Sequence, residues 1–296
     1  MNLQTFRRAS LNLSRHIRKP AQASLLERFA QPPHTLRVRS HYPSKFLLPF
    51  QTRTMASAAR AMEQRLTGKT VLITGASSGI GRSTALEFAR TAPKDLKLIL
   101  TARRLESLHD LQQQIASEVG SGVKVHPVKM DVSNVAEVQS FVSNLPQEFA
   151  EIDVLVNNAG LVLGVDKAPE IKQSDIHTMI DTNITGLIGM TQAVLPVFKK
   201  RPDGGAGDVI NVGSIAGREG YPGGSIYCAT KAAIRAFTEA LRKEMIATRI
   251  RIMEIDPGQV ETEFSMVRFG GDKAKADAVY ACVWLLILWV MGLLTV

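Results

Sequence analysis

From Lys69 onward, short apolar runs alternate with longer stretches in which apolar residues recur at helical spacing. The runs are continuously apolar, which is typical of strands buried on both faces of a parallel sheet. Six strands alternating with helices predict an α/β fold, a doubly wound, Rossmann-type sheet in a single domain. The expected strands are 70–74, 96–101, 123–128, 153–157, 208–212 and 249–255, and the expected helices lie near 80–91, 104–118, 134–145, 174–199 and 226–246.

The net charge of +9 is concentrated at one end of the chain. The first 66 residues hold 12 Lys and Arg but only two acids, whereas the remainder is nearly balanced. The folded part therefore lacks the basic footprint of a nucleic-acid-binding protein. The two cysteines, Cys228 and Cys282, form no disulfide framework, and no Cys/His cluster indicates a metal site. We therefore expect neither nucleic acid nor metal as a partner.

Residues 1–54 are rich in Arg, contain Ser and are almost free of acids. Four apolar residues among the first 17 recur at helical spacing, with basic residues off that stripe, which is typical of a mitochondrial transit peptide. We favour this interpretation and a mitochondrial location. The alternative is an untranslated leader before a start at Met55, which would favour the cytoplasm. In either case the folded domain is expected at residues 66–280.

The first expected strand runs directly into a glycine-rich turn that is followed by a helix. In such a unit, backbone N–H groups and the helix N-terminus can hold a pyrophosphate. Gly75 would permit the tight turn, Gly79 the close approach of the backbone, and Gly81 the packing of helix on strand. Three glycines can also form a plain turn, but the flanking strand and helix favour a dinucleotide site. The residues expected to bind there are Gly75, Ser77, Ser78, Gly79, Ile80 and Gly81.

The end of the second expected strand indicates which dinucleotide is bound. NAD-binding sheets usually place an acid there for the ribose 2′-OH, but this chain has Arg103 and Arg104. Arginines can pair with a 2′-phosphate, so we expect NADP; the alternative is that they begin a solvated helix. Asp131, after the third strand, would lie beside the adenine amine. The residues that follow the fourth strand would approach the cofactor ribose: Asn158, Ala159 and Gly160.

Tyr227 and Lys231 stand four residues apart at the start of an expected helix, so their side chains project from one face. A free phenol has a pKa of about 10, and we expect the neighbouring ammonium and the positively charged nicotinamide ring together to lower it toward the working pH. Tyr227 would then exchange a proton with a carbonyl or hydroxyl oxygen. Ser214 would bond to the same oxygen, and Asn183 would bind water and orient Lys231. Each residue alone has an ordinary structural explanation, but their order indicates catalysis.

Together these segments resemble the short-chain dehydrogenase/reductase family over about residues 66–280. The resemblance rests on TGASSGIG at 74–81, NNAG at 157–160, Asn183, Ser214, YCATK at 227–231 and DPG at 256–258. It implies a catalytic tetrad of Asn183, Ser214, Tyr227 and Lys231, of which Tyr227 and Lys231 also contact the cofactor. It further implies that the nicotinamide half is bound by Pro257, Gly258, Val260 and Thr262.

Three stretches are most similar to the NADP-dependent 3-hydroxy acid dehydrogenases of that family: 145–160, 213–233 and 257–269. This resemblance implies oxidation of small-molecule substrates such as L-serine and L-allo-threonine, or reduction of the matching carbonyl. Such a substrate needs a cation for its carboxylate near Tyr227 and Ser214, and Arg218 and Arg268 are the candidates. Arg218 could instead form a surface salt bridge. The alternatives are a ketone, sterol or sugar substrate, and a form that binds the cofactor without turnover.

The last segment, 278–296, is an uncharged apolar run that contains both tryptophans. Its length fits a membrane helix, the only route by which we expect membrane association. A buried replacement helix is another interpretation. We favour a third, in which a reading-frame or exon-boundary error replaces the natural end, because the resemblance implies a further strand after Tyr280. We therefore expect the C-terminal strand to be missing and the homo-oligomer of the family to be compromised.

Overall fold

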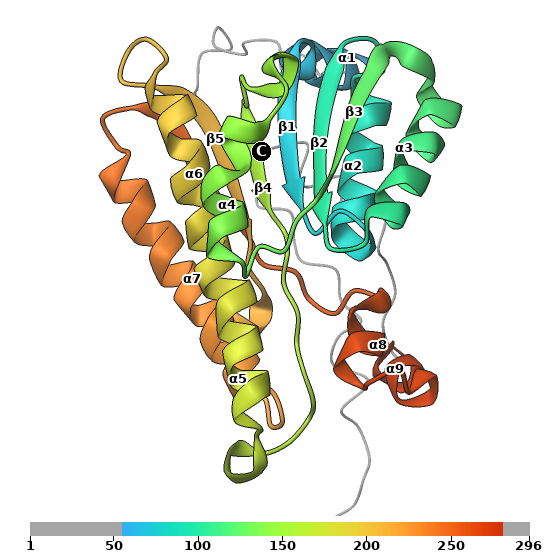
Figure 1. The fold of residues 1–296 in the computed structure, drawn as a ribbon, viewed down its shortest axis with the longest axis vertical. Helices are drawn as coiled ribbons and strands as arrows, with labels where there is room; N and C mark the ends of the chain where they lie inside the picture. Colours follow the sequence, from blue (N-terminus) through green and yellow to red (C-terminus); the bar gives the residue numbers. More distant parts are fainter. Residues whose placement is uncertain (1–54, 281–296) are drawn as a thin grey trace, which may run out of the picture. The chain divides into compact units, whose positions relative to one another are not determined.

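The computed structural model describes residues 55–280, so the leader at 1–54 and the tail from 281 onward lie outside the described residues. Six parallel strands form one sheet in the order β3-β2-β1-β4-β5-β6 (Figure 1). The strands are β1 Lys69–Thr74, β2 Leu96–Ala102, β3 Val123–Lys129, β4 Val154–Asn157, β5 Ala206–Val212 and β6 Arg249–Ile255. The doubly wound α/β fold is confirmed, with β6 at one edge of the described sheet.

Helices cover both faces of the sheet, as two separate apolar cores show. The α-helices are α1 Met55–Leu66, α2 Gly79–Thr91, α3 Leu105–Val119, α4 Val135–Phe141, α5 Gln173–Ile180, α6 Leu187–Lys199, α7 Ser225–Glu244, α8 Glu263–Arg268 and α9 Lys273–Tyr280. Side chains of α2 and α3 pack on Val71 and Ile73 of β1. The intervening Leu72 faces the opposite core, which holds side chains of α4, α6 and α7. This alternation is the two-residue period of a strand.

Within residues 55–280, no helix is both long and apolar enough to cross a bilayer.

The chain reverses its direction of winding between β1 and β4, which are neighbours in the sheet although β2 and β3 separate them in sequence. Loops leaving the carboxyl ends of these two strands diverge to opposite faces and leave a crevice, the usual ligand site of such sheets. Helices α8 and α9 lie beyond this end of the sheet (Figure 1). They were not expected from sequence, because α8 spans only six residues and α9 only eight, too short for a clear helical period.

The helix expected at 174–199 is interrupted by a π-helical turn, Asp181–Gly186, between α5 and α6. At Gly186 the helix closely approaches the loop after β3, since a Cβ there would lie 2.8 Å from the Val132 oxygen. The turn also places Asn183 in the interior, where it is fully buried. A wide turn leaves little trace in a period of 3.6 residues, so the sequence pattern could not reveal it.

A row of buried, hydrogen-bonded polar side chains links β4 and β5 to α6 and α7. The Asn157 amide donates to Thr191 Oγ1 and to Asn211 Oδ1, each at 2.9 Å. The Asn211 amide in turn donates to Thr238 Oγ1 at 2.9 Å. All four side chains are buried, so each bond also avoids the cost of an unpaired polar group in the core.

We predict that Asn157→Ala destabilises the folded chain by about 1–3 kcal/mol, because Thr191 and Asn211 each lose a buried donor. Urea unfolding of the full chain measures this change. The matched control is Asn144→Ala at an exposed position, for which a change within about 0.5 kcal/mol is expected. Equal stability of the two variants would show that the buried amide contributes nothing specific.

Candidate active site

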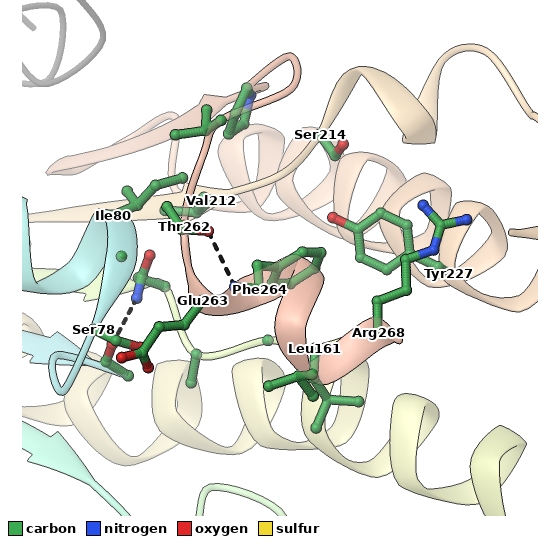
Figure 2. Close-up of a pocket in the computed structure, with 18 of the residues that line it drawn as sticks. Ser78, Ile80, Leu161, Val212, Ser214, Tyr227, Thr262, Glu263, Phe264 and Arg268 are labelled. Carbon is green, nitrogen blue, oxygen red and sulfur yellow. Dashed lines mark hydrogen bonds between the residues drawn. The ribbon is translucent and has the colours of Figure 1, made fainter. Parts of the chain in front are cut away.

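A cavity of about 850 Å³ lies at the carboxyl ends of the strands, between the glycine turn, α7 and α8 (Figure 2). Most of the residues expected from sequence to form the site line this cavity. The lining residues are Gly75, Ser77, Ser78, Gly79, Ile80, Arg103, Arg104, Asp131, Asn158, Ala159, Gly160, Ser214, Tyr227, Lys231, Pro257, Gly258, Val260, Thr262 and Arg268. Gly81, Asn183 and Arg218 are not among them.

The glycine turn presents backbone to the cavity because side chains would not fit. Gly75 has a φ of +67°, and a Cβ there would lie 2.8 Å from the Cα of Ala159. A Cβ at Gly81 would lie 2.5 Å from both the Gly75 oxygen and Asn158 Nδ2, so Gly81 lets α2 start against the turn. Bare backbone at the N-terminus of a helix is the arrangement that binds a pyrophosphate. The residues present therefore fit a dinucleotide.

Thr74, the last residue of β1, fixes this turn to the loop after β4. Its hydroxyl oxygen accepts the backbone N–H groups of Asn158 and Ala159, each at 3.0 Å. In return, the Asn158 amide donates to the Thr74 and Gly75 carbonyl oxygens at 2.9 and 3.1 Å. Sequence reasoning did not assign Thr74 a role, although its place between an apolar strand and a glycine turn was a signal.

Cationic side chains gather where β2 ends. Arg103 and Arg104 both line the cavity, and Arg104 Nη2 lies 3.3 Å from Ser77 Oγ. The same nitrogen donates to Glu263 Oε2 at 2.8 Å. Beyond β3, the Asp131 carboxylate accepts the Ser133 N–H and hydroxyl at 3.0 and 2.7 Å. This end of the cavity thus offers guanidinium groups to an anion and a fixed carboxylate to an amine.

Tyr227 lies in the first turn of α7, with its hydroxyl on the side of Ser214 (Figure 2). Its ring packs edge-on against Phe264 of α8, with the two ring centroids 5.7 Å apart. Ser214 Oγ accepts the Ala216 N–H at 3.1 Å, which fixes the hydroxyl at the end of β5. The hydroxyl groups of Tyr227 and Ser214 therefore face the same small part of the cavity. A substrate oxygen placed there could exchange a proton with one of them.

Burial raises the pKa of Tyr227 above its ordinary value, and a hydrogen bond from Ser214 only partly offsets this. Side chains of the protein therefore do not by themselves lower this pKa, and the expected contribution of the nicotinamide ring stays a prediction. Desolvation of the phenolate outweighs both that hydrogen bond and the attraction of the Arg268 guanidinium.

Lys231 is a buried ammonium one helical turn beyond Tyr227. It donates to the Val212 carbonyl oxygen at 2.8 Å. Burial lowers its pKa to about 8, although the carboxylates of Asp256 and Glu254 act in the opposite direction. Its ammonium form is therefore less favoured than that of an exposed lysine.

Asn183 holds the wall of the site. Its amide oxygen accepts the Leu161 N–H at 2.9 Å, and its nitrogen donates to the Leu161 oxygen and to Thr230 Oγ1 at 2.8 and 3.1 Å. These bonds join the loop after β4 to α7 close to Tyr227. Lys231, which Asn183 was expected to orient, is held directly by Val212.

The structure separates the two arginines expected near the substrate. Arg218 pairs with the Asp256 carboxylate at 2.6 Å and does not line the cavity. Arg268, on α8, lines the cavity with its guanidinium 5.1 Å from the centroid of the Tyr221 ring. Its Nε is buried and has no hydrogen-bond partner among the described residues. Figure 2 shows its guanidinium beside Tyr227. Arg268 is therefore the cation placed to receive an anion near Tyr227.

Two carboxylates lie behind the site at the end of β6. A Cβ at Gly213 would lie 2.1 Å from Asp256 Oδ1 and 2.7 Å from Glu254 Oε1, so only glycine fits between them and the sheet. Asp256 accepts the Ser214 N–H at 3.1 Å and pairs with Arg218. Burial and the nearby Asp256 charge raise the pKa of Glu254 to about 7. Within residues 55–280, no cluster of acidic, His or Cys side chains is arranged to hold a metal ion.

This chain belongs to the short chain dehydrogenase family, whose model matches residues 69–271. It is 57% identical over 216 residues to an NADP-dependent 3-hydroxy acid dehydrogenase of Schizosaccharomyces pombe, covering 73% of this chain and 81% of the relative. A sulfoacetaldehyde reductase of Chromohalobacter salexigens is 45% identical, covering 71% of this chain and 80% of the relative. A solved closed form of serine dehydrogenase complexed with NADP+ superimposes with a TM-score of 0.65 at 41% identity, covering 73% of this chain and 82% of that one. The chain is accordingly an oxidoreductase of this family.

We predict that Glu254→Gln removes a pH-dependent penalty on folding. The folded state binds the Glu254 proton more tightly than the unfolded state, whose pKa is the ordinary 4.5. Stability should therefore fall as pH rises from the unfolded pKa through about 7. From pH 5 to pH 8 the variant should gain about 1 kcal/mol relative to the native chain, since solvent screening reduces the full effect.

Urea unfolding at both pH values measures that gain. Glu244→Gln, at the exposed end of α7, is the matched control. The same pH dependence in both variants would contradict the assignment to Glu254.

Proposed function

We propose that this chain is an NADP-dependent oxidoreductase that oxidises the CH–OH group of small 3-hydroxy acids, such as L-serine or L-allo-threonine, and reduces the matching carbonyl. The observation that carries the proposal is the convergence of Tyr227, Ser214 and Arg268 on one cavity that also contains the glycine turn. Proton exchange, anion binding and dinucleotide binding are thereby available in one place.

The preference for NADP is supported by the end of β2. Arg103 and Arg104 line the cavity where an NAD-binding sheet usually has an acid, and a guanidinium suits a 2′-phosphate. Names of similar proteins point the same way, since one relative is called NADP-dependent and one solved structure is a complex with NADP+. When bound, the nicotinamide ring supplies the acceptor or donor of the hydride.

The side chains of this chain handle the proton. In reduction, the Tyr227 phenol donates its proton to the carbonyl oxygen, and its raised pKa keeps that proton available. In oxidation, Tyr227 acts as the phenolate: it takes the hydroxyl proton and becomes the phenol, while the C–H bond gives up its hydride to the nicotinamide. The substrate oxygen is oriented by Ser214, and the Lys231 ammonium stabilises the phenolate left after donation. Both directions therefore use the same pair of hydroxyl groups.

Arg268 supports an anionic substrate. The relatives named above act on a 3-hydroxy acid and on sulfoacetaldehyde, both of which carry an anionic group close to the reacting carbon. A neutral ketone or sterol would leave the buried Arg268 Nε without a partner, which is costly. Reduction of a small sulfonated aldehyde is the second candidate, favoured by the sulfoacetaldehyde reductase relative.

We predict that Tyr227→Phe lowers kcat/KM by about 10² to 10⁴-fold, because the group that exchanges the proton is removed. NADPH binding should remain. The experiment compares L-serine, L-allo-threonine and other 3-hydroxy acids with NADP and NAD side by side, and tests sulfoacetaldehyde with NADPH. Retained turnover in Tyr227→Phe, or NADPH binding by the native chain without turnover of any substrate in the panel, would overturn the proposal.

We predict that Arg268→Ala lowers kcat/KM for anionic substrates by about 10- to 100-fold, mainly through KM, because a charge-assisted hydrogen bond is lost. Turnover of a neutral alcohol of similar size should change little. The matched control is Arg218→Ala, which removes an arginine outside the cavity. A larger effect of Arg218→Ala on KM would show that Arg268 is the wrong cation.

A further inference from the structure

Glu263 reaches across the cavity from α8 to the opposite wall. It is the first residue of α8, and its carboxylate pairs with Arg104 Nη2, 159 positions away in sequence, at 2.8 Å. Figure 2 shows the side chain extending over the glycine turn toward Ser78. A carboxylate thus occupies a position suited to a phosphate group, beside both the turn and the end of β2.

The pair is weak enough to be exchanged. The Arg104 and Glu263 side chains are 54% and 58% exposed, and ion pairs of this kind contribute little to stability. The other charged group that faces the carboxylate is Arg82, with Ser78 as a hydrogen-bond donor, and the Arg104 bond holds the pKa of Glu263 below its ordinary value. Glu263 is therefore ionised at neutral pH and repels any second anion brought to Arg104.

We propose that Glu263 is a cofactor-specificity residue whose carboxylate competes with the cofactor 2′-phosphate for the Arg104 guanidinium. The inference rests on the proposed function, because it takes Arg104 as the 2′-phosphate site. Binding of NADP then exchanges an internal carboxylate for a phosphate. A dinucleotide that lacks the 2′-phosphate does not compete for that guanidinium. Glu263 therefore reduces the preference for NADP that Arg103 and Arg104 create.

A purely structural role of Glu263 would lead to a different result. If the ion pair only positions α8, its loss would affect dinucleotides with and without the 2′-phosphate alike. The residue before α8, Thr262, lies beside the glycine turn that both would share: a Cβ at Gly79 would be 3.2 Å from its Cβ. Competition at Arg104 instead changes the ratio of the two affinities. That ratio is therefore the readout that separates the two roles.

The test titrates the full chain with NADPH and with NADH, followed by nucleotide fluorescence, which needs no turnover. Glu263→Gln should tighten NADPH binding by about two- to fivefold and leave NADH binding unchanged. The gain should shrink at high ionic strength, and it should vanish when Arg104→Gln is also present. Glu261→Gln is the matched control, because this exposed glutamate does not line the cavity.

Three results would contradict competition between Glu263 and the 2′-phosphate for Arg104. An unchanged ratio of NADPH to NADH affinity in Glu263→Gln overturns competition, and so does a gain that persists in the absence of Arg104. An equal gain in Glu261→Gln would show a general charge effect and also overturns it. If the native chain binds NADH but not NADPH, the proposed cofactor itself is wrong, which is distinguishable from an unchanged ratio.

Discussion

The Thr74 hydroxyl joins the two halves of the sheet at the point where the site begins. It accepts two backbone N–H groups of the loop after β4, while Asn158 returns two bonds to the glycine turn. That loop continues to Leu161, which Asn183 ties to Thr230 on α7. A continuous set of hydrogen bonds thus runs from the glycine turn to α7, the helix that carries Tyr227 and Lys231. The glycine-turn side and the α7 side of the cavity are positioned by the same contacts.

The burial of Tyr227 and Lys231 opposes the ionisation of both side chains. Burial makes the Tyr227 phenolate and the Lys231 ammonium both unfavourable, so it raises the tyrosine pKa and lowers the lysine pKa and thereby moves the two values apart. Tyr227 is buried in a third apolar cluster, where it packs with Leu161, Val162 and Met179. The pKa values of these two side chains therefore depend on their burial as much as on their residue type.

Sequence patterns predicted the six strands and the helices that flank them to within a few residues, because continuous apolar runs report burial on both faces. They also predicted the residues of the glycine turn. Among the features that escaped them are the partner that holds Lys231, the choice between Arg218 and Arg268, and the bridge made by Glu263. Each depends on which distant segments meet at the carboxyl ends of the strands, and short polar helices such as α8 carry no periodic signal.

The π-helical turn at Asp181–Gly186 is wider than an α-helical turn and accommodates one extra residue within a continuous helix. Each residue of an α-helix rotates the face by about 100°, so an unbroken α-helix would point Asn183 away from the loop that it anchors. The turn therefore changes the direction in which the side chains of α6 point relative to those of α5. Each half of the helix can follow its own packing surface, one against α7 and the other against the sheet. This segment must therefore preserve its length together with Asn183 and Gly186, whose contacts depend on it.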